Sequence, residues 1–245
     1  MPEEQRLERP SRWRRWRRRL LWLPLVLAAA SVLQVAVLRF VDPPFTSFMA
    51  IRQVKALAAG DTGFRIAHDW RSLERMSRSV PLALIAAEDQ RFAEHRGFDV
   101  EAIEQARERN EEGGRMRGGS TISQQTAKNL FLWSGSGWNR WLRKALETWY
   151  TFWIEVLWSK SRIIEVYANV AEFGDGVYGA QAAARTWFRR DADALDAAQA
   201  ARLAAVLPNP KRYSVARPGP YVQRRAASIQ RQMRNLGGEA YLEGL

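Results

Sequence analysis

The sequence of 245 residues contains no cysteine and only two histidines, His68 and His95. The lack of cysteine excludes disulfide bonds, thiolate metal sites and a cysteine nucleophile, and it leaves the redox compartment open. Two histidines offer little material for a zinc site or for a serine–histidine relay. Acidic residues are also few, since 26 Asp and Glu face 38 Lys and Arg, a formal net charge of +12. Such an excess favours an anionic partner, namely nucleic acid, a membrane surface or phosphate.

Hydrophobic residues make up 47% of the chain and charged residues 26%, which argues against a disordered chain and against a polytopic membrane protein. The first 19 residues hold eight arginines and three glutamates, so they contribute +5 of the charge. Residues 20–38, LLWLPLVLAAASVLQVAVL, then carry no formal charge. As a helix they extend over roughly 28 Å, about the thickness of the hydrocarbon core of a bilayer.

This pattern predicts a basic cytoplasmic segment (1–19), a single transmembrane anchor (20–38) and a working domain outside the cytoplasm (39–245), because flanking arginines stay on the inner side. A signal peptide cleaved after Ala28-Ala29-Ala30 is the alternative. The apolar run continues to Leu38, beyond the point where a signal peptide turns polar, and therefore favours the anchor. A nucleic-acid-binding tail explains the arginines less well than membrane topology does.

Helix signals dominate the outer part, and strand-like alternation is scarce. Thr121 with Gln124 and Asp196 with Gln199 have the spacing of capping boxes. Apolar residues recur at helical spacing from Val222 to Leu236. Helices are expected over residues 81–95, 100–110, 121–131, 138–158, 162–170, 179–188, 196–207 and 222–236. The prediction is a mostly α single domain on a membrane stalk.

Glu88 is the first candidate for chemistry. On a continuous helix, Glu88, Phe92 and His95 share one stripe, whereas Asp89 is rotated by about 100°. The preceding apolar run, residues 82–87, is expected to raise the pKa of Glu88 toward the range of a general base. The alternative is that Glu88 and Asp89 form an ordinary solvated pair.

Two further segments are rich in groups that could bind anions. Gly118 and Gly119 lead into a helix start, with Lys128 further along; a plain capped loop is the alternative. In RKALE, residues 143–147, Arg143 and Glu147 can pair at i, i+4 while Lys144 points elsewhere, although a solvated helix face has the same pattern. Six of the eleven tryptophans lie within residues 133–158, and they fit either a buried core or a membrane interface.

Together these segments resemble the family 51 glycosyltransferases, the peptidoglycan glycosyltransferases that polymerise lipid II. The matching segments, in family order, are EDQRFAEHRGFD (88–99), GGSTISQQTAKN (118–129), RKALE (143–147), KSRIIEVYANVAEFGDGVYGAQAAARTWF (160–188) and LAAVLPNPKRYSV (203–215). Ser123 stands where threonine is usual and Ala168 where leucine is usual. Neither departure affects a charged position. The sequence contains no SxxK or KTG motif. In this respect it resembles the monofunctional members of the family, which lack a transpeptidase domain.

The resemblance implies a lysozyme-like, mostly helical fold and an inverting reaction that makes β-1,4 glycan strands. It implies that Glu88 is the general base and Glu147 a second essential carboxylate. It also implies that the pyrophosphates and the glycan are bound by Lys128, Arg143, Lys144, Gln124, Asn129, Ser120 and Thr121. No metal site is expected from the sequence, although members of the family are often assayed with a divalent cation, Mg or Mn.

The partners implied are lipid II, the nascent lipid-linked glycan chain and the inner membrane, with cell-division or wall-synthesis proteins as further candidates and no nucleic acid. The catalytic domain is then periplasmic. Two other functions stay open. A degradative lysozyme-like enzyme also uses a helical glutamate, and a non-enzymatic scaffold would use the tryptophans and helices alone.

Overall fold

The structure is a computed structural model that describes residues 12–101, 104, 119–133 and 139–245, with side chains from residue 22 onward. It is mostly helical, as predicted. The α-helices are α1 (Arg12–Leu38), α2 (Ser47–Ala58), α3 (Ser79–Glu88), α5 (Ile122–Phe131), α6 (Arg140–Leu157), α7 (Lys160–Val170), α8 (Ala180–Phe188), α9 (Ala197–Val206) and α10 (Pro220–Asn235). Short 3₁₀ helices are η1 (Leu73–Arg75), η2 (Ala192–Ala194) and η3 (Gly238–Gly244). Three short strands, β1 (Ala67–His68), β2 (Glu172–Gly174) and β3 (Val177–Tyr178), form a small sheet in the order β1–β3–β2.

Local sequence signals explain most of the helix ends. Both predicted capping boxes are confirmed, at Thr121–Gln124 for α5 and at Asp196–Gln199 for α9. The predicted apolar stripe of α10 is also confirmed, because Val222, Ala226, Ile229 and Met233 are buried. The helix expected over 100–110 falls mostly outside the described residues, as do Gly118 and Trp138.

One helix prediction is wrong in a way that matters for the site. The helix expected to continue to residue 95 ends at Glu88, because Asp89 leaves the helix with a φ of −159°. Glu88, Phe92 and His95 therefore do not form a helical stripe. The Asp89 carboxylate instead accepts the backbone N–H of Ile122, 33 residues away. The helix ends here because of a tertiary contact that no local pattern shows.

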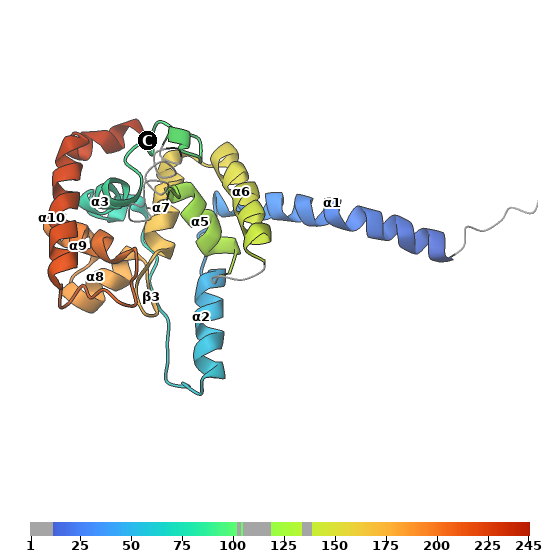
Figure 1. Cartoon of the computed structure of the whole chain (residues 1–245), viewed down its shortest axis with the longest axis horizontal. Coiled ribbons are helices and arrows are strands. Elements are labelled where there is room, and N and C mark those ends of the chain that lie inside the picture. Colours follow the sequence, from blue (N-terminus) through green and yellow to red (C-terminus); the bar gives the residue numbers. More distant parts are fainter. Residues whose placement is uncertain (1–11, 102–103, 105–118, 134–138) are drawn as a thin grey trace, which may run out of the picture.

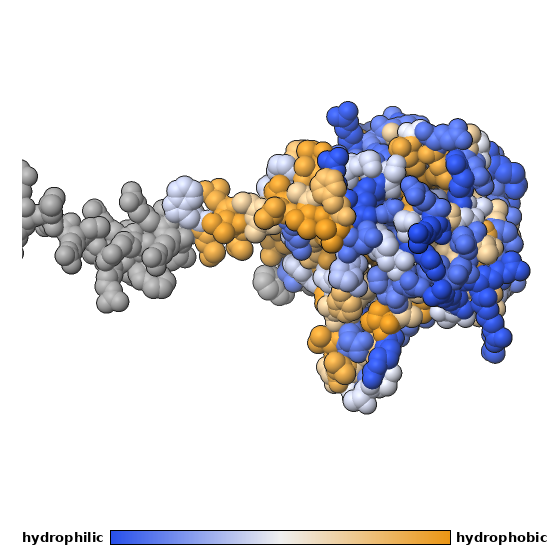
Figure 2. All heavy atoms as spheres, turned by 180° about the vertical axis from the view of Figure 1, so that it is seen from behind, coloured by the Kyte–Doolittle hydropathy of each residue, from blue (hydrophilic) through white to orange (hydrophobic). Residues whose placement is uncertain are grey.

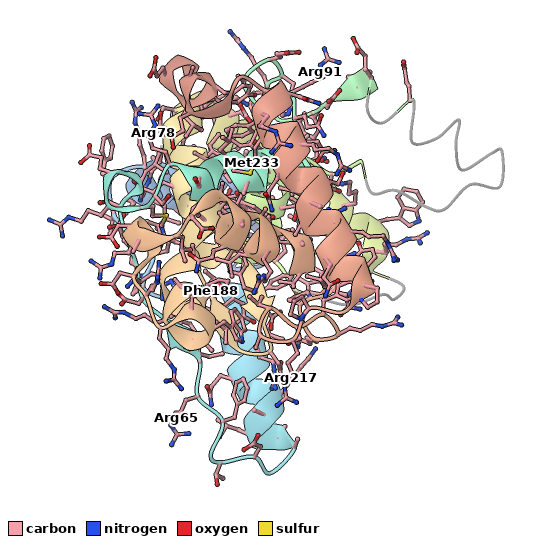
Figure 3. The ribbon with its side chains drawn as sticks, turned by 90° about the vertical axis from the view of Figure 1, so that its left-hand side faces the viewer. Arg65, Arg78, Arg91, Phe188, Arg217 and Met233 are labelled. Carbon is pink, nitrogen blue, oxygen red and sulfur yellow. The ribbon has the colours of Figure 1, made fainter. Side chains whose placement is uncertain are left out.

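The core of the domain is built by α3, α7, α9 and α10, and α5 packs between α6 and α7 (Figure 1). Met233 of α10 lies inside this core, whereas Arg65 and Arg217 are exposed at the surface (Figure 3). Gly179, between β3 and α8, has a φ of +84°, and a Cβ there would lie 2.7 Å from the Asn169 carbonyl oxygen. This close approach requires glycine.

Helix α1 projects away from the body, but its C-terminal part is attached firmly to α6 and to the start of α7 (Figure 1). The Trp149 Nε1 atom donates to Ser31 Oγ at 3.0 Å, and Trp158 Nε1 donates to the Val35 carbonyl oxygen at 2.8 Å. Arg162 donates to the Leu38 carbonyl oxygen at 3.0 Å. In the part of the chain with described side chains, no helix is both long and apolar enough to cross a membrane.

Exposed apolar side chains gather on the side of the body that carries α1, while the opposite side is largely hydrophilic (Figure 2). On α6 they include Trp141, which is 76% exposed, and Phe152, which is 51% exposed. Trp158, by contrast, is buried. The buried-core interpretation therefore holds for Trp158, and the membrane interface stays a prediction for the exposed Trp141.

Candidate active site

Glu88 is the last residue of α3, and its side chain faces α5 and α10. Its Oε2 atom accepts a hydrogen bond from Gln125 Nε2 at 2.9 Å, and its Oε1 atom lies 3.4 Å from Arg225 Nη2. The side chain is only 15% exposed. Gln125 is oriented in turn by Tyr167, whose hydroxyl donates to Gln125 Oε1 at 3.1 Å. Since a carboxylate only accepts, this arrangement directs the amide N–H groups of Gln125 at Glu88.

Burial raises the pKa of Glu88, and the Gln125 hydrogen bond and the positive charges of Arg225 and Lys128 act in the opposite direction. Burial also raises the pKa of Tyr167 well above its ordinary value, so its hydroxyl remains a donor. The alternative of an ordinary solvated Glu88–Asp89 pair is wrong, because the two side chains are only 15% and 3% exposed. The pKa of Glu88 rises, which is the predicted direction.

Asp89 connects the segment after Glu88 to the N-terminus of α5. His95 Nε2 lies 2.9 and 3.0 Å from its two carboxylate oxygens, and the Ile122 N–H donates to Oδ2 at 3.0 Å. The Gly97 N–H donates to His95 Nδ1 at 3.1 Å, so the proton of a neutral His95 ring is on Nε2. This network fixes α5 relative to Glu88 and so brings Gln125 to the carboxylate.

The residues expected to bind substrate on α5 differ in their surroundings. Thr121 and Gln124 are both only 3% exposed and satisfy each other's backbone N–H groups in the capping box, so their side chains stabilise the helix start. Ser120 is exposed and Asn129 is half-buried. Ser123, which departs from the family pattern, donates to the buried Glu155 carboxylate.

Lys128 is close enough to both candidate carboxylates for their charges to act on it. Burial lowers the pKa of its amino group, and the charges that act on it are those of Glu147, Arg143, Glu88 and Lys144. The structure therefore brings together the five charged residues predicted from the sequence. We refer to Lys128, Arg143 and Lys144 as the cationic cluster.

The pairing predicted inside RKALE is wrong. Lys144 Nζ lies 2.6 Å from Glu147 Oε1, and Arg143 Nη1 lies 3.4 Å from the Trp133 carbonyl oxygen. Positions i, i+3 and i, i+4 both lie on one helix face, so spacing alone does not choose between them. Glu147 is buried at 6% exposure, whereas the Lys144 side chain is 48% exposed.

The sequence interpretation missed Arg225, Gln125 and Tyr167 as contributors to the site. Gln125 is in the matching segment GGSTISQQTAKN, three residues before Lys128, and helical spacing could have identified it. Arg225 is 137 residues from Glu88 and outside every matching segment. Only the tertiary structure identifies it.

The resemblance to the family 51 enzymes allows for a divalent cation, Mg or Mn. In the described parts of the chain, no three His, Asp or Glu side chains gather into a group that could hold a metal ion.

A helical domain with a buried glutamate beside a cationic cluster fits an enzyme that transfers a glycosyl group from a phosphate leaving group. The family model described as Transglycosylase matches residues 56–234. The chain belongs to this family and is a glycosyltransferase enzyme, as the sequence segments predicted.

Curated relatives are similar over nearly the whole length. A biosynthetic peptidoglycan transglycosylase of Xanthomonas axonopodis pv. citri (strain 306) is 57% identical over 234 residues, which cover 96% of this chain and 94% of the relative. The protein of the same name from Xylella fastidiosa (strain 9a5c) is 56% identical over 232 residues, which cover 95% of this chain and 94% of the relative.

Proposed function

We propose that this protein is a peptidoglycan glycosyltransferase of cell wall biosynthesis that polymerises lipid II into β-1,4 glycan strands and releases undecaprenyl pyrophosphate. Two findings support the proposal: the family match and the names of relatives at 57% identity. The observation that carries it is the buried Glu88 carboxylate between Gln125 and Arg225, next to the cationic cluster.

In this mechanism Glu88 acts as the general base. It takes the proton from the 4-hydroxyl of the acceptor sugar, and the oxygen attacks the anomeric carbon of the lipid-linked donor from the face opposite the diphosphate. The bond to the diphosphate breaks with inversion from α to β. A base is most effective when its pKa is near the working pH, and burial shifts the pKa of Glu88 in that direction.

The cationic cluster stabilises the departing diphosphate. A positive charge about 4 Å from the leaving oxygen contributes about 4 kcal/mol at an effective dielectric constant near 20, before desolvation is subtracted. Glu147 positions the cationic cluster and does not transfer a proton, because its Oε1 atom lies 2.6 Å from Lys144 Nζ. The roles of Ser120 and Asn129 in glycan binding stay predictions, and those of Thr121 and Gln124 are less favoured, since capping α5 engages their side chains.

We also propose that α1 anchors the enzyme in the inner membrane through residues 20–38, with residues 1–19 in the cytoplasm and the catalytic domain in the periplasm. The uncharged run, the arginines before it and the exposed Leu25, Leu27 and Leu33 side chains support this arrangement.

The function is tested with the full-length protein and purified lipid II carrying a fluorescent label. We expect long glycan strands that a muramidase degrades, and inverted β linkages by NMR. Isolated cell-wall sacculi form the second arm, since a degradative enzyme would release soluble fragments from them without any lipid substrate. Degradation of sacculi with no polymer from lipid II would contradict the proposal.

A further inference from the structure

Positive charge is concentrated in the C-terminal part of the domain. Residues 197–238, from the start of α9 to just beyond α10, contain eight Lys and Arg and no Asp or Glu. Residues 39–245 have a net charge of +7, so the domain without this segment has a net charge of −1. The basic excess of the domain is therefore a property of one segment and not of the whole surface.

Four arginines of this segment are exposed and have no acidic partner. Arg212 and Arg217 lie before α10. Arg231 and Arg234 lie three residues apart on α10, on the side away from its buried stripe. None of the four side chains forms an ion pair with a described residue, and both acidic residues of η3 pair with Arg78 instead. We refer to these four arginines as the basic face.

The position and the composition of the basic face limit what can bind there. Helix α10 lies on the side of the body opposite to α1 (Figure 1), and it is in front when the molecule is viewed from that side (Figure 3). An anchor formed by α1 therefore places the bilayer on the far side of the domain. Among the described residues after Val156, no large hydrophobic side chain is exposed. Protein interfaces depend on buried aromatic and aliphatic anchors, so a hydrated polyanion fits this face better than a protein does.

Helix α10 also reaches the candidate catalytic carboxylate. The Nη2 atom of Arg225, on the same helix, lies 3.4 Å from Glu88 Oε1. The helix has 16 residues and is about 24 Å long, so one element connects the proposed site of bond formation with the basic face. A glycan backbone is uncharged, but the lactyl-linked peptides of peptidoglycan carry free carboxylates. A strand that is made at Glu88 is therefore a polyanion.

We infer that the basic face binds the peptide carboxylates of the nascent glycan strand after they leave the site; the inference rests on the proposed function. Each contact is exposed, weak and screened by salt, so binding depends on several contacts along one strand. The basic face takes no part in bond formation. It keeps the strand on the enzyme between successive additions and so increases the length of the product.

Two double variants separate the basic face from general surface charge. Arg231→Gln/Arg234→Gln removes two positive charges from the face. Arg75→Gln/Arg190→Gln removes two charges from exposed positions outside residues 197–238 and is the matched control. Circular dichroism and thermal unfolding report whether both variants fold.

Binding is measured first, without any turnover. The full-length protein in phospholipid nanodiscs is titrated with fluorescent, lipid-free glycan strands that carry their peptides, and with the same strands after an amidase has removed the peptides. We expect the intact strands to bind more tightly, and added salt to weaken their binding. Arg231→Gln/Arg234→Gln should raise Kd for intact strands roughly fivefold, because two weak exposed contacts are lost, and the control variant should match the wild type.

Turnover tests the consequence for the product. With labelled lipid II, both variants should consume substrate at the wild-type initial rate, because neither changes a group near Glu88. Strands from Arg231→Gln/Arg234→Gln should be shorter, by up to the same factor as the rise in Kd, because faster release ends elongation sooner. Strands from the control variant should have the wild-type length. Gel electrophoresis of the products measures both.

Equal affinity for intact and peptide-free strands would overturn the inference, and so would equal effects of the two double variants on affinity or strand length. Tighter binding of polyglutamate than of intact strands at equal carboxylate content would also overturn it, because the face would then suit an acidic protein. Failure of the proposed function gives a different result: a wild type that binds intact strands but makes none from lipid II contradicts the function alone. Polymerisation by a wild type that does not bind intact strands contradicts this inference alone.

Discussion

The end of α3 and the first half of α6 each present one buried carboxylate, and the two have different partners. Glu88 accepts from the neutral Gln125 amide at 2.9 Å, and its cation, Arg225, is 3.4 Å away. Glu147 is in direct contact with an ammonium group, at 2.6 Å from Lys144. A carboxylate held mainly by a neutral donor can accept a proton without breaking a close ion pair, whereas one in direct contact with an ammonium group cannot. The comparison assigns proton transfer to Glu88 and organisation of the cationic cluster to Glu147.

The largest expected effect tests this division directly. Glu88→Gln keeps the shape of the side chain and removes the base, so the rate of polymerisation should fall about 10²–10⁴-fold, the usual contribution of general base catalysis. Glu94→Gln, at a 60% exposed position in the following segment, should be unchanged. Circular dichroism and thermal unfolding report whether both variants fold. A Glu88→Gln enzyme with full activity would end the assignment.

Removal of the half-buried Lys128 cation comes next. Lys128→Met retains the aliphatic stem and loses the charge, so kcat should fall about 10²-fold or more, as when one stabilising donor is removed from a transition state. Lys55→Met on α2, at an exposed position, is the control. Steady-state kinetics with lipid II measure both. An unchanged kcat with a raised KM would mean that Lys128 binds the ground state alone.

A smaller effect is expected on the pH–rate profile when Arg225 is replaced, and none when its exposed neighbour Arg224 is replaced. The charge of Arg225 opposes the upward shift of the Glu88 pKa, so Arg225→Gln should raise this pKa further. The acid limb of the pH–rate profile should then move to higher pH, and activity should recover as the pH rises. Arg224→Gln should leave the profile unchanged. An activity loss of equal size at every pH would indicate that Arg225 has only a structural role.

The smallest effect concerns α5, the helix that carries Gln125 and Lys128. Thr121 caps α5, so Thr121→Ala should lower the free energy of unfolding by about 1 kcal/mol. KM for lipid II should stay near its wild-type value, because this hydroxyl donates to the Gly97 carbonyl oxygen at 2.7 Å. Chemical denaturation and kinetics measure the two quantities. A large rise in KM at unchanged stability would restore the substrate-binding role predicted from the sequence.

The sequence predicts the parts of this molecule that local patterns determine. The capping boxes of α5 and α9 and the apolar stripe of α10 depend on residues three or four apart, and their helices form where expected. The end of α3 depends on the bond from Asp89 to the Ile122 N–H, so the sequence placed it seven residues too late. The α2 helix and the small sheet were not predicted, since their elements are short and their pairing partners are distant.

The site shows the same division. Resemblance to the family identified Glu88, Glu147 and the cationic cluster, and the fold brings them together. The hydrogen-bond and ion-pair partners of the two carboxylates were not predicted. Arg225 reaches Glu88 from α10, and Lys144, rather than Arg143, pairs with Glu147. The sequence shows which charged residues are present, but the partners and the burial of each charged side chain depend on how the helices pack.

The most direct test of the account is the pH dependence of kcat at saturating lipid II, measured for the wild type, Glu88→Gln and Glu147→Gln. The account predicts an acid limb in the wild type with a midpoint above about 4.3, the ordinary value for glutamate, because burial raises the pKa of Glu88. This limb should be retained by Glu147→Gln and absent from the residual activity of Glu88→Gln. An acid limb that survives Glu88→Gln and disappears with Glu147→Gln would contradict the assignment of the base.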